Sequence, residues 1–341
     1  MRICIVGAGA IGGLLGARLT LSGNRVTVID QGAHLEAIQS NGLKLIWADG
    51  TEYLATDLAA TASFEEAGPQ DLVILAIKAH YIAAVADRLP TLYGPDTMVL
   101  TVQNGLPWWY FQKHGGEFDG RRLECLDPDG KLEANIGPER IIGCVVYPAA
   151  GVTAPGVIRH VEGDRFPVGE LDNTETERLS RVHDTIVEAG LRSRVLTSIR
   201  SEIWLKAWGN LSFNPISALT HATLVDMCEF PETRRLAENM MREAAEIAGK
   251  LGIEFRHTIE RRIEGARGVG AHKTSMLQDV EAGRSLEIEA LVGSVIEMGR
   301  LTGTPCPHID AVYACTKLLD RTMAQEGARV NVEKLAVEKA A

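Results

Sequence analysis

The chain has 341 residues and a formal net charge of -10, with no block of lysines and arginines. Its hydrophobic content of 45% and its charged content of 23% are ordinary for globular proteins, which excludes disordered and fibrous classes. The acidic balance disfavours nucleic acid and anionic membrane surfaces as partners. At about 150 residues per domain, this length predicts two domains.

The pattern of apolar residues and cysteines bears on the cellular compartment. No apolar run approaches the roughly 18 residues of a membrane span, and glycines interrupt any signal-peptide pattern in the opening stretch MRICIVGAGAIGG. The six cysteines are scattered without a CxxC pair, which predicts buried free thiols and no metal site. We therefore expect a cytoplasmic protein. The sequence leaves the oligomeric state open, and a homodimer is compatible with it.

The first part of the chain alternates apolar, strand-like runs with helical patterns. We expect strands at residues 2–6, 25–29, 71–77, 97–102 and 140–147. Helices are expected between several of them, at 11–22, 35–40 and 81–92. The strands read as continuous Val, Ile and Leu runs, which are typical of a mostly parallel sheet covered on both faces.

After about Ile199 the strand signal ends, and helical patterns follow at 201–213, 232–251, 275–282, 285–301 and 309–323. We expect a dinucleotide-binding domain at 1–197 and a helical domain at 198–341. The first domain carries an insertion at 107–138, which opens on PWWYF and is rich in glycine and charge. Loops of this length are usually functional or disordered. The aromatic run favours an ordered wall or a subunit contact.

A glycine motif follows the first expected strand. Gly7, Gly9 and Gly12 form a GxGxxG pattern, an amphipathic helical pattern follows, and Asp30 ends the second strand. In such a motif the glycines permit a tight turn, the approach of a pyrophosphate and close helix packing, and the acidic residue binds a ribose. The motif alone is also compatible with a glycine-rich turn of another doubly wound protein. The expected dinucleotide-binding residues of this region are Gly7, Gly9, Ala10, Ile11, Gly12 and Asp30.

A polar stripe lies in the otherwise apolar helical stretch SEIWLKAWGNLSFNPISAL. Lys206, Asn210 and Asn214 recur every four residues, which places them along one side of a helix. Asparagine is a poor helix former, and a buried amine or amide needs partners. The stripe therefore indicates a binding or catalytic surface.

Several stretches together resemble the ketopantoate reductases, also called 2-dehydropantoate 2-reductases. They are GAGAIGG, IKAHY at 77–81, QNGL at 103–106, IRSEIWLKAWGNLSFNP at 199–215 and TSMLQDVEAGRSLEIEA at 274–290. The resemblance implies an N-terminal Rossmann-type, doubly wound sheet and an all-helical C-terminal domain similar to that of 6-phosphogluconate dehydrogenase, with the active site in the cleft between them. It also implies NADPH-dependent reduction of the ketone of 2-dehydropantoate to pantoate, in pantothenate synthesis.

The resemblance also implies roles for individual residues. Lys206 is similar to the family's catalytic lysine, and Glu287 to its active-site glutamate. The positions similar to substrate-binding residues are Asn104, Asn210, Asn214 and Ser275. Lys78, Asn104 and Glu287 are similar to residues that lie near the cofactor.

The residue types support these roles independently. Hydride transfer to a ketone leaves an alkoxide, so an ammonium group in position stabilises the charge and donates the proton as general acid. Burial of Lys206 among Trp and Leu side chains favours release of that proton. Glu287 either holds Lys206 in place or hydrogen-bonds a substrate hydroxyl, and the amides supply neutral donors and acceptors.

Plainer interpretations compete with each role. Lys206 can extend to the surface, and Lys78 can be an ordinary lysine at a strand end. Asn214 precedes Pro215, where a helix tends to stop, so it can satisfy freed backbone groups. The remaining two alternatives are structural pairs: a capping box of Ser275 with Gln278, and an ion pair of Glu287 with Arg284.

The cofactor and the substrate remain open between alternatives. Family members that use NADPH commonly carry an arginine just past the second strand, whereas this chain has Asp30 followed by Gln31, which favours NADH. The leading hypothesis is an NAD(P)H-dependent reductase of 2-dehydropantoate. A reductase of a different small 2-oxo acid is the nearest alternative, because the 107–138 insertion follows Asn104. A non-catalytic NAD(P) sensor is a third, which the pair Lys206 and Glu287 disfavours.

Overall fold

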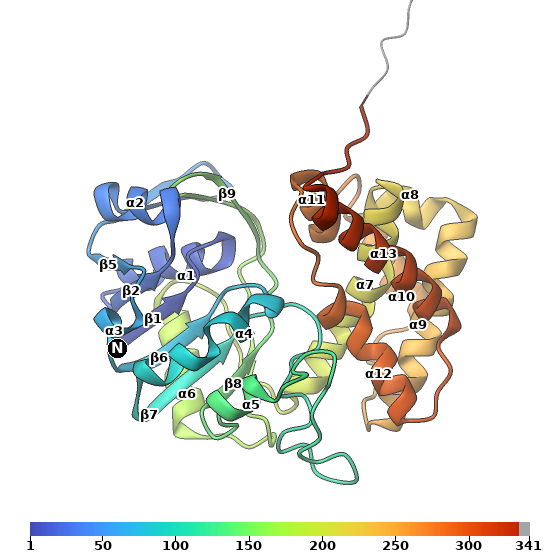
Figure 1. Ribbon diagram of the computed structural model, residues 1–341, viewed down its shortest axis with the longest axis horizontal. Coiled ribbons are helices and arrows are strands. Elements are labelled where there is room, and N and C mark those ends of the chain that lie inside the picture. Colours follow the sequence, from blue (N-terminus) through green and yellow to red (C-terminus); the bar gives the residue numbers. More distant parts are fainter. Residues whose placement is uncertain (334–341) are drawn as a thin grey trace, which may run out of the picture. The chain divides into compact units, whose positions relative to one another are not determined.

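The computed structural model describes residues 1–333. The chain divides into two compact units, Met1–Ile203 and a second that begins at Trp204. The first unit is α/β and the second is helical, which confirms the fold class expected from the sequence (Figure 1).

The main sheet of the first unit has seven strands in the order β11-β8-β7-β6-β1-β2-β5. Their bounds are β1 (Arg2–Val6), β2 (Arg25–Ile29), β5 (Leu58–Thr61), β6 (Gln70–Leu75), β7 (Tyr93–Thr101), β8 (Ile141–Cys144) and β11 (Val168–Gly169). All neighbours are parallel except β11, which is antiparallel to β8. The first six follow the 3-2-1-4-5-6 order of dinucleotide-binding sheets, and the five predicted strands are among them.

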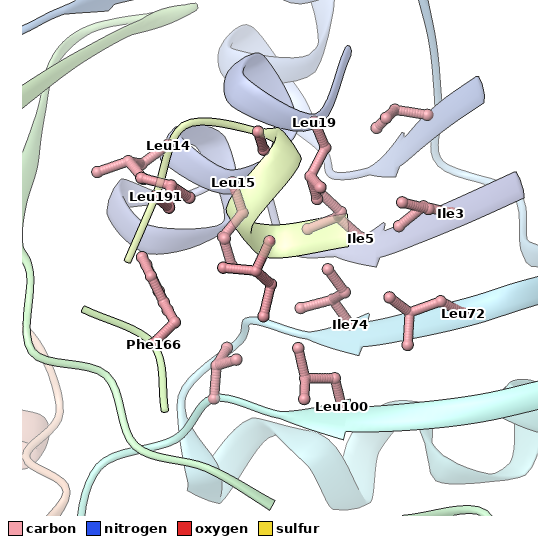
Figure 2. Close-up of a cluster of buried hydrophobic side chains, with 14 of the residues drawn as sticks. Ile3, Ile5, Leu14, Leu15, Leu19, Leu72, Ile74, Leu100, Phe166 and Leu191 are labelled. Atoms are coloured by element: carbon pink, nitrogen blue, oxygen red, sulfur yellow. The ribbon is translucent and has the colours of Figure 1, made fainter. Parts of the chain in front are cut away.

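The sheet is held by a core of aliphatic side chains. Figure 2 shows this cluster, in which Ile3 and Ile5 of β1, Ile74 of β6 and Leu100 of β7 lie beside leucines of the first helix. These side chains are at most 1% exposed. Removal of this apolar surface from water is the main stabilising term, at about 25 cal/mol per Å².

The first helix, α1 (Ala10–Leu21), packs between two sheets. The second sheet has the order β4-β3-β10-β9, with β4 (Glu52–Ala55), β3 (Leu43–Ile46), β10 (Val157–Glu162) and β9 (Ala149–Ala154). A Cβ at Gly13 would meet Ile158 of β10, and one at Gly16 would lie 3.3 Å from Leu43. The expected amphipathic pattern is therefore wrong, because α1 is buried almost all round.

The remaining helices of the first unit are short, apart from α2 and α6. They are α2 (Gly32–Asn41), α3 (Phe64–Ala67), η1 (Ala79–Tyr81), α4 (Ile82–Val85), η2 (Ala86–Leu92), α5 (Lys131–Asn135) and α6 (Glu177–Glu188). The single helix predicted at 81–92 is broken into one α and two 3₁₀ segments. Pro90 lies inside the last of these and has no amide hydrogen for the helix ladder.

The aromatic run of the 107–138 segment is part of the core of the first unit. Trp108, Trp109, Tyr110 and Phe111 are each at most 6% exposed. The indole Nε1 of Trp109 donates to Oγ1 of Thr101 at 3.1 Å. The aromatic run is therefore ordered and buried, whereas the alternative of a subunit contact stays a prediction.

The second unit is helical throughout its described residues. Its helices are α7 (Ile199–Thr220), which begins in the first unit, α8 (Leu224–Glu229), α9 (Pro231–Lys250), α10 (Ile259–Gly268), α11 (Ser275–Ala282), the π-helical turn η3 (Glu289–Gly293), α12 (Ser294–Leu301) and α13 (Pro307–Glu326). The prediction for 275–282 is confirmed residue for residue. The helix predicted at 201–213 continues to Thr220, through Pro215.

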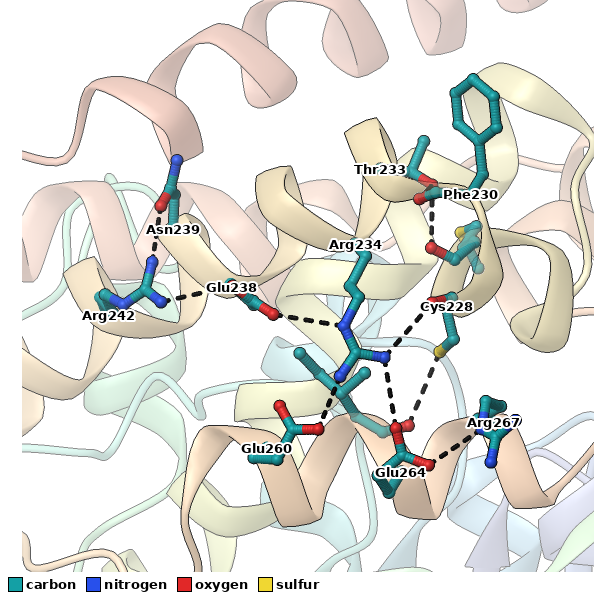
Figure 3. A network of polar contacts seen from close by, with 12 residues as sticks. Cys228, Phe230, Thr233, Arg234, Glu238, Asn239, Arg242, Glu260, Glu264 and Arg267 are labelled. Carbon is teal, nitrogen blue, oxygen red and sulfur yellow. Dashed lines mark hydrogen bonds and ion pairs between the residues drawn. The ribbon is translucent and has the colours of Figure 1, made fainter.

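An ion-pair network joins two of these helices (Figure 3). Arg234 of α9 contacts Glu238 at 3.3 Å and two carboxylates of α10, Glu260 at 2.7 Å and Glu264 at 3.2 Å. Exposed single ion pairs contribute little to stability, whereas one arginine shared by three carboxylates forms a network. The network connects α9 to α10.

Candidate functional site

The glycine loop after β1 has the geometry that dinucleotide binding requires. Gly7 has φ +96°, in the region that favours glycine, and a Cβ there would lie 2.5 Å from Cγ2 of Ile77. A Cβ at Gly12 would overlap the carbonyl oxygen of Gly7 and lie 2.9 Å from Cβ of Ala76. The tight turn and the close packing of helix on strand, both expected from the motif, are thus present.

The start of α1 fits an anionic group. A Cβ at Gly9, the N-cap residue, would meet no atom within 4 Å, so the backbone is accessible there. Ala10 and Ile11 open the helix, and no acidic residue lies in its first turn. The positive end of the helix dipole and the amide groups of this turn favour a phosphate. These residues fit a pyrophosphate.

Asp30 follows β2 directly and is tied to the glycine loop. Its Oδ2 accepts the amide hydrogen of Ala8 at 2.6 Å, and its Oδ1 accepts that of Gln31 at 2.7 Å. Asp30 is half-buried. Each carboxylate oxygen has a second lone pair, so the group retains acceptor capacity for the hydroxyls of a ribose.

Lys78 and Asn104 lie in the two loops that follow β6 and β7. Both are half-buried. Gln103 links these loops, because its Nε2 donates to the carbonyl oxygens of Leu75 at 2.6 Å and Ile77 at 3.0 Å. Its Oε1 is buried and accepts no hydrogen bond within residues 1–333. Gln103 lies in the QNGL stretch, but no pattern in the sequence indicates this link between the two loops.

The polar stripe lies on α7, as its spacing predicts. Lys206 and Asn210 are half-buried, and Asn214 is 6% exposed. The opposite side of the helix is anchored in the core of the second unit. There, Nε1 of Trp208 donates to the carbonyl oxygen of Met241 at 2.7 Å, and its ring stacks on Phe255 at 4.1 Å.

Asn214 and Ser275 are brought together by α7 and α11. Nδ2 of Asn214 lies 3.4 Å from Oγ of Ser275. Ser275 is not the cap of α11, because the N-cap is Thr274, whose Oγ1 accepts the amide hydrogen of Leu277 at 3.2 Å. The capping alternative for Ser275 is therefore wrong, and its hydroxyl faces the polar stripe.

Glu287 lies in the short segment before the π-helical turn, and its carbonyl oxygen accepts the amide hydrogen of Leu291 at 3.1 Å. The helix predicted to begin at Ser285 therefore starts only after Glu287. Arg284, the partner weighed for Glu287, binds Oδ1 of Asp279 at 2.9 Å. The expected residues are thus divided between the two units, and within the second unit Asn214 contacts Ser275.

Two negative findings concern residues 1–333. Three or more His, Cys, Asp or Glu side chains nowhere gather in this part of the chain as they would around a metal ion. No helix within the same range is both long and apolar enough to cross a membrane.

Comparisons with known proteins agree with this arrangement. The family model described as ketopantoate reductase PanE/ApbA matches residues 3–173, and its C-terminal counterpart matches residues 198–320. A 2-dehydropantoate 2-reductase of Mesorhizobium japonicum is 52% identical over 320 residues, which cover 94% of this chain and 98% of the relative.

Solved structures share the fold of this chain. A protein of Ralstonia solanacearum MolK2 assigned as a ketopantoate reductase is 39% identical with a TM-score of 0.90, covering 95% of this chain and 98% of that chain. A D-mandelate dehydrogenase solved with NADH and anilino(oxo)acetate is 22% identical with a TM-score of 0.80, covering 95% and 100%. At 22% identity the likeness shows the fold alone.

Proposed function

Because this chain belongs to the ketopantoate reductase PanE/ApbA family, we propose that it reduces the ketone of 2-dehydropantoate to pantoate with a nicotinamide dinucleotide. This is a step of pantothenate biosynthesis. The identity of 52% along nearly the whole length of a 2-dehydropantoate 2-reductase carries the proposal. The glycine loop and the polar stripe supply the two sites that such a reaction needs.

The first unit holds the dinucleotide. Gly7, Gly9 and Gly12 shape the loop, Ala10 and Ile11 present backbone amides to the pyrophosphate, and Asp30 accepts hydrogen bonds from the ribose. Lys78 and Asn104 extend this site along the ends of β6 and β7. When bound, the nicotinamide supplies the hydride.

The second unit handles the proton and the substrate's oxygens. The ammonium group of Lys206 stabilises the negative charge that develops on the carbonyl oxygen and donates a proton to that oxygen. Asn210, Asn214 and Ser275 bind the carboxylate and hydroxyl oxygens of the substrate. Glu287 orients Lys206 or binds a substrate hydroxyl.

One feature favours a second candidate, reduction of a different 2-oxo acid. The 107–138 segment begins three residues after Asn104 and packs its aromatic side chains into the core, so a change in this segment can alter the substrate pocket beside Asn104. The homodimer, and the absence of nucleic-acid and membrane partners, stay predictions.

The test is turnover of NADH and NADPH against a panel of 2-oxo acids, including the one that corresponds to mandelate. We expect the highest kcat/KM with 2-dehydropantoate. Lys206→Ala is expected to lower kcat by about 10² to 10⁴, the range for a lost general acid, with an unchanged cofactor Kd. Lys250→Ala, at a lysine 44% exposed on α9, is the matched control.

Each outcome has a separate meaning. Wild-type turnover by Lys206→Ala would remove Lys206 from the mechanism. A wild-type enzyme that prefers another panel member would support the second candidate. A wild-type protein that binds the dinucleotide and reduces no acid of the panel would favour the sensor function.

A further inference from the structure

His34, in the first turn of α2, uses both nitrogens of its ring to join two backbone segments. Nε2 lies 2.9 Å from the carbonyl oxygen of Ala8, and the amide of Gly156 donates to Nδ1 at 3.1 Å. Because a backbone amide can only donate, Nδ1 is the acceptor and Nε2 carries the proton. The two contacts therefore require the neutral ring with its proton on Nε2.

The first of these segments is the glycine loop itself. Ala8 lies between Gly7 and Gly9, and its two backbone groups are both held: the amide by Asp30 and the carbonyl by His34. A trans peptide is planar, and its carbonyl and amide point in opposite directions. The contact of His34 with the Ala8 oxygen therefore sets the direction of the Gly9 amide.

The second segment is the turn between β9 and β10. Gly156 has φ +72° in this turn, and its carbonyl oxygen accepts the amide hydrogen of Lys44 in β3 at 2.9 Å. The turn is thus part of the second sheet, whose β10 also packs against α1 at Gly13. His34 therefore connects the second sheet to the glycine loop.

We propose that His34 is a positioning residue of the dinucleotide site, which holds the Ala8–Gly9 peptide so that the Gly9 amide faces the pyrophosphate. The inference rests on the proposed function, because it assumes that the glycine loop binds NAD(P)H. His34 acts through the loop and makes no contact with reacting atoms. Its loss must therefore weaken cofactor binding and leave the chemical step intact.

The experiment is fluorescence titration of the full chain with NADH and with NADPH, together with steady-state kinetics. For His34→Phe, which keeps a ring and loses both hydrogen bonds, we expect Kd to rise about tenfold, the effect of about 1.4 kcal/mol. The kcat at saturating cofactor should stay within about twofold. His34→Gln, whose amide supplies both N–H donors and an oxygen acceptor, should recover most of the affinity.

The control is His183→Phe, at a histidine of α6 in the same unit that contacts Asp184. It should bind cofactor as the wild type does. The positioning role would be overturned if the cofactor Kd of His34→Phe equals that of the wild type. It would also be overturned if His34→Phe loses affinity for the cofactor and His34→Gln does not recover it. A wild-type chain that binds neither cofactor would instead contradict the proposed function, so the two failures are distinguishable.

Discussion

At the residue scale, the carboxylate of Asp30 holds the glycine loop through the amide of Ala8. It directly follows β2, the position from which an acidic residue binds the ribose hydroxyls in dinucleotide-binding sheets. A 2′-phosphate carries up to two negative charges, and a carboxylate at short range repels it. The next residue is the uncharged Gln31, so no arginine directly follows to offset the repulsion.

We therefore predict that the enzyme uses NADH at least as well as NADPH, and that Asp30→Ala shifts the ratio of the two kcat/KM values towards NADPH. Because the variant also loses the bond to Ala8, both absolute values should fall, and the ratio is the informative measurement. Gln31→Ala is the matched control and should leave the ratio unchanged. A tenfold preference of the wild type for NADPH that persists in Asp30→Ala would show that Asp30 does not contact the ribose.

The sequence predicts a site residue well when its signal is local. The spacing of Lys206, Asn210 and Asn214 fixes their common side of α7, because helix periodicity alone determines it. The role of Ser275 is ambiguous from the sequence, because Thr274, one position earlier, carries a hydroxyl that can cap the helix equally well. His34 contacts Gly156, which is 122 residues away in the sequence, and no local sequence pattern predicts such a contact.

At the scale of elements, one arginine ties the 107–138 segment to the start of α7. Arg200, 4% exposed, donates to the carbonyl oxygens of Tyr110 and Gln112, each at 2.7 Å, and of Leu171. Burial lowers the pKa of its guanidinium, since the low dielectric disfavours the charged form. The guanidinium N–H groups compensate for the cost of burying the charge, because they donate to three backbone carbonyl oxygens.

Arg200→Met should therefore destabilise the fold by about 3 kcal/mol, because it leaves carbonyl groups without donors at a buried position. Arg200→Lys should lose somewhat less stability than Arg200→Met, since an ammonium group lacks the planar fork of donors of a guanidinium. Urea unfolding followed by circular dichroism measures both. Arg192→Met, at an arginine 70% exposed that pairs with Asp164, should change stability by less than about 0.5 kcal/mol. An Arg200→Met variant as stable as this control would contradict the structural role.

The second sheet shows where prediction of elements from sequence ends. Strands β3 and β4 have four residues each, and β9 reads AAGVTA, a sequence poor in β-branched and aromatic residues. Their stability comes from pairing, and β3 pairs with β10 through contacts such as Leu45 with Ile158, more than a hundred residues apart. In contrast, β1 and β2 are apolar runs bounded by glycine and polar residues, so their limits were predicted correctly.

At the scale of the whole molecule, the exposure of each of the six thiols reflects the packing of the unit in which it lies. The prediction of buried free thiols is confirmed for Cys4, Cys144, Cys228 and Cys306, whereas Cys125 is half-buried and Cys315 is exposed. Cys315 lies on the outward side of α13, where helix periodicity alone gave no sign of its exposure. Burial raises the pKa of Cys4 to about 12, and that of Cys228 and of Cys306 to about 11.

Only the thiolate reacts with alkylating reagents, so these pKa values predict the order of modification. At pH 8, the shift of Cys4 from 9.0 to about 12 lowers its thiolate fraction about a thousandfold, before steric protection is counted. Mass spectrometry after timed exposure to iodoacetamide should find Cys315 modified first, and Cys315→Ser should remove this fast phase. Urea should then expose Cys4 when the first unit unfolds, and Cys228 with Cys306 when the second does. If Cys4 reacts in the native protein as fast as Cys315, the strand β1 that carries the glycine loop opens far more readily than its packing implies.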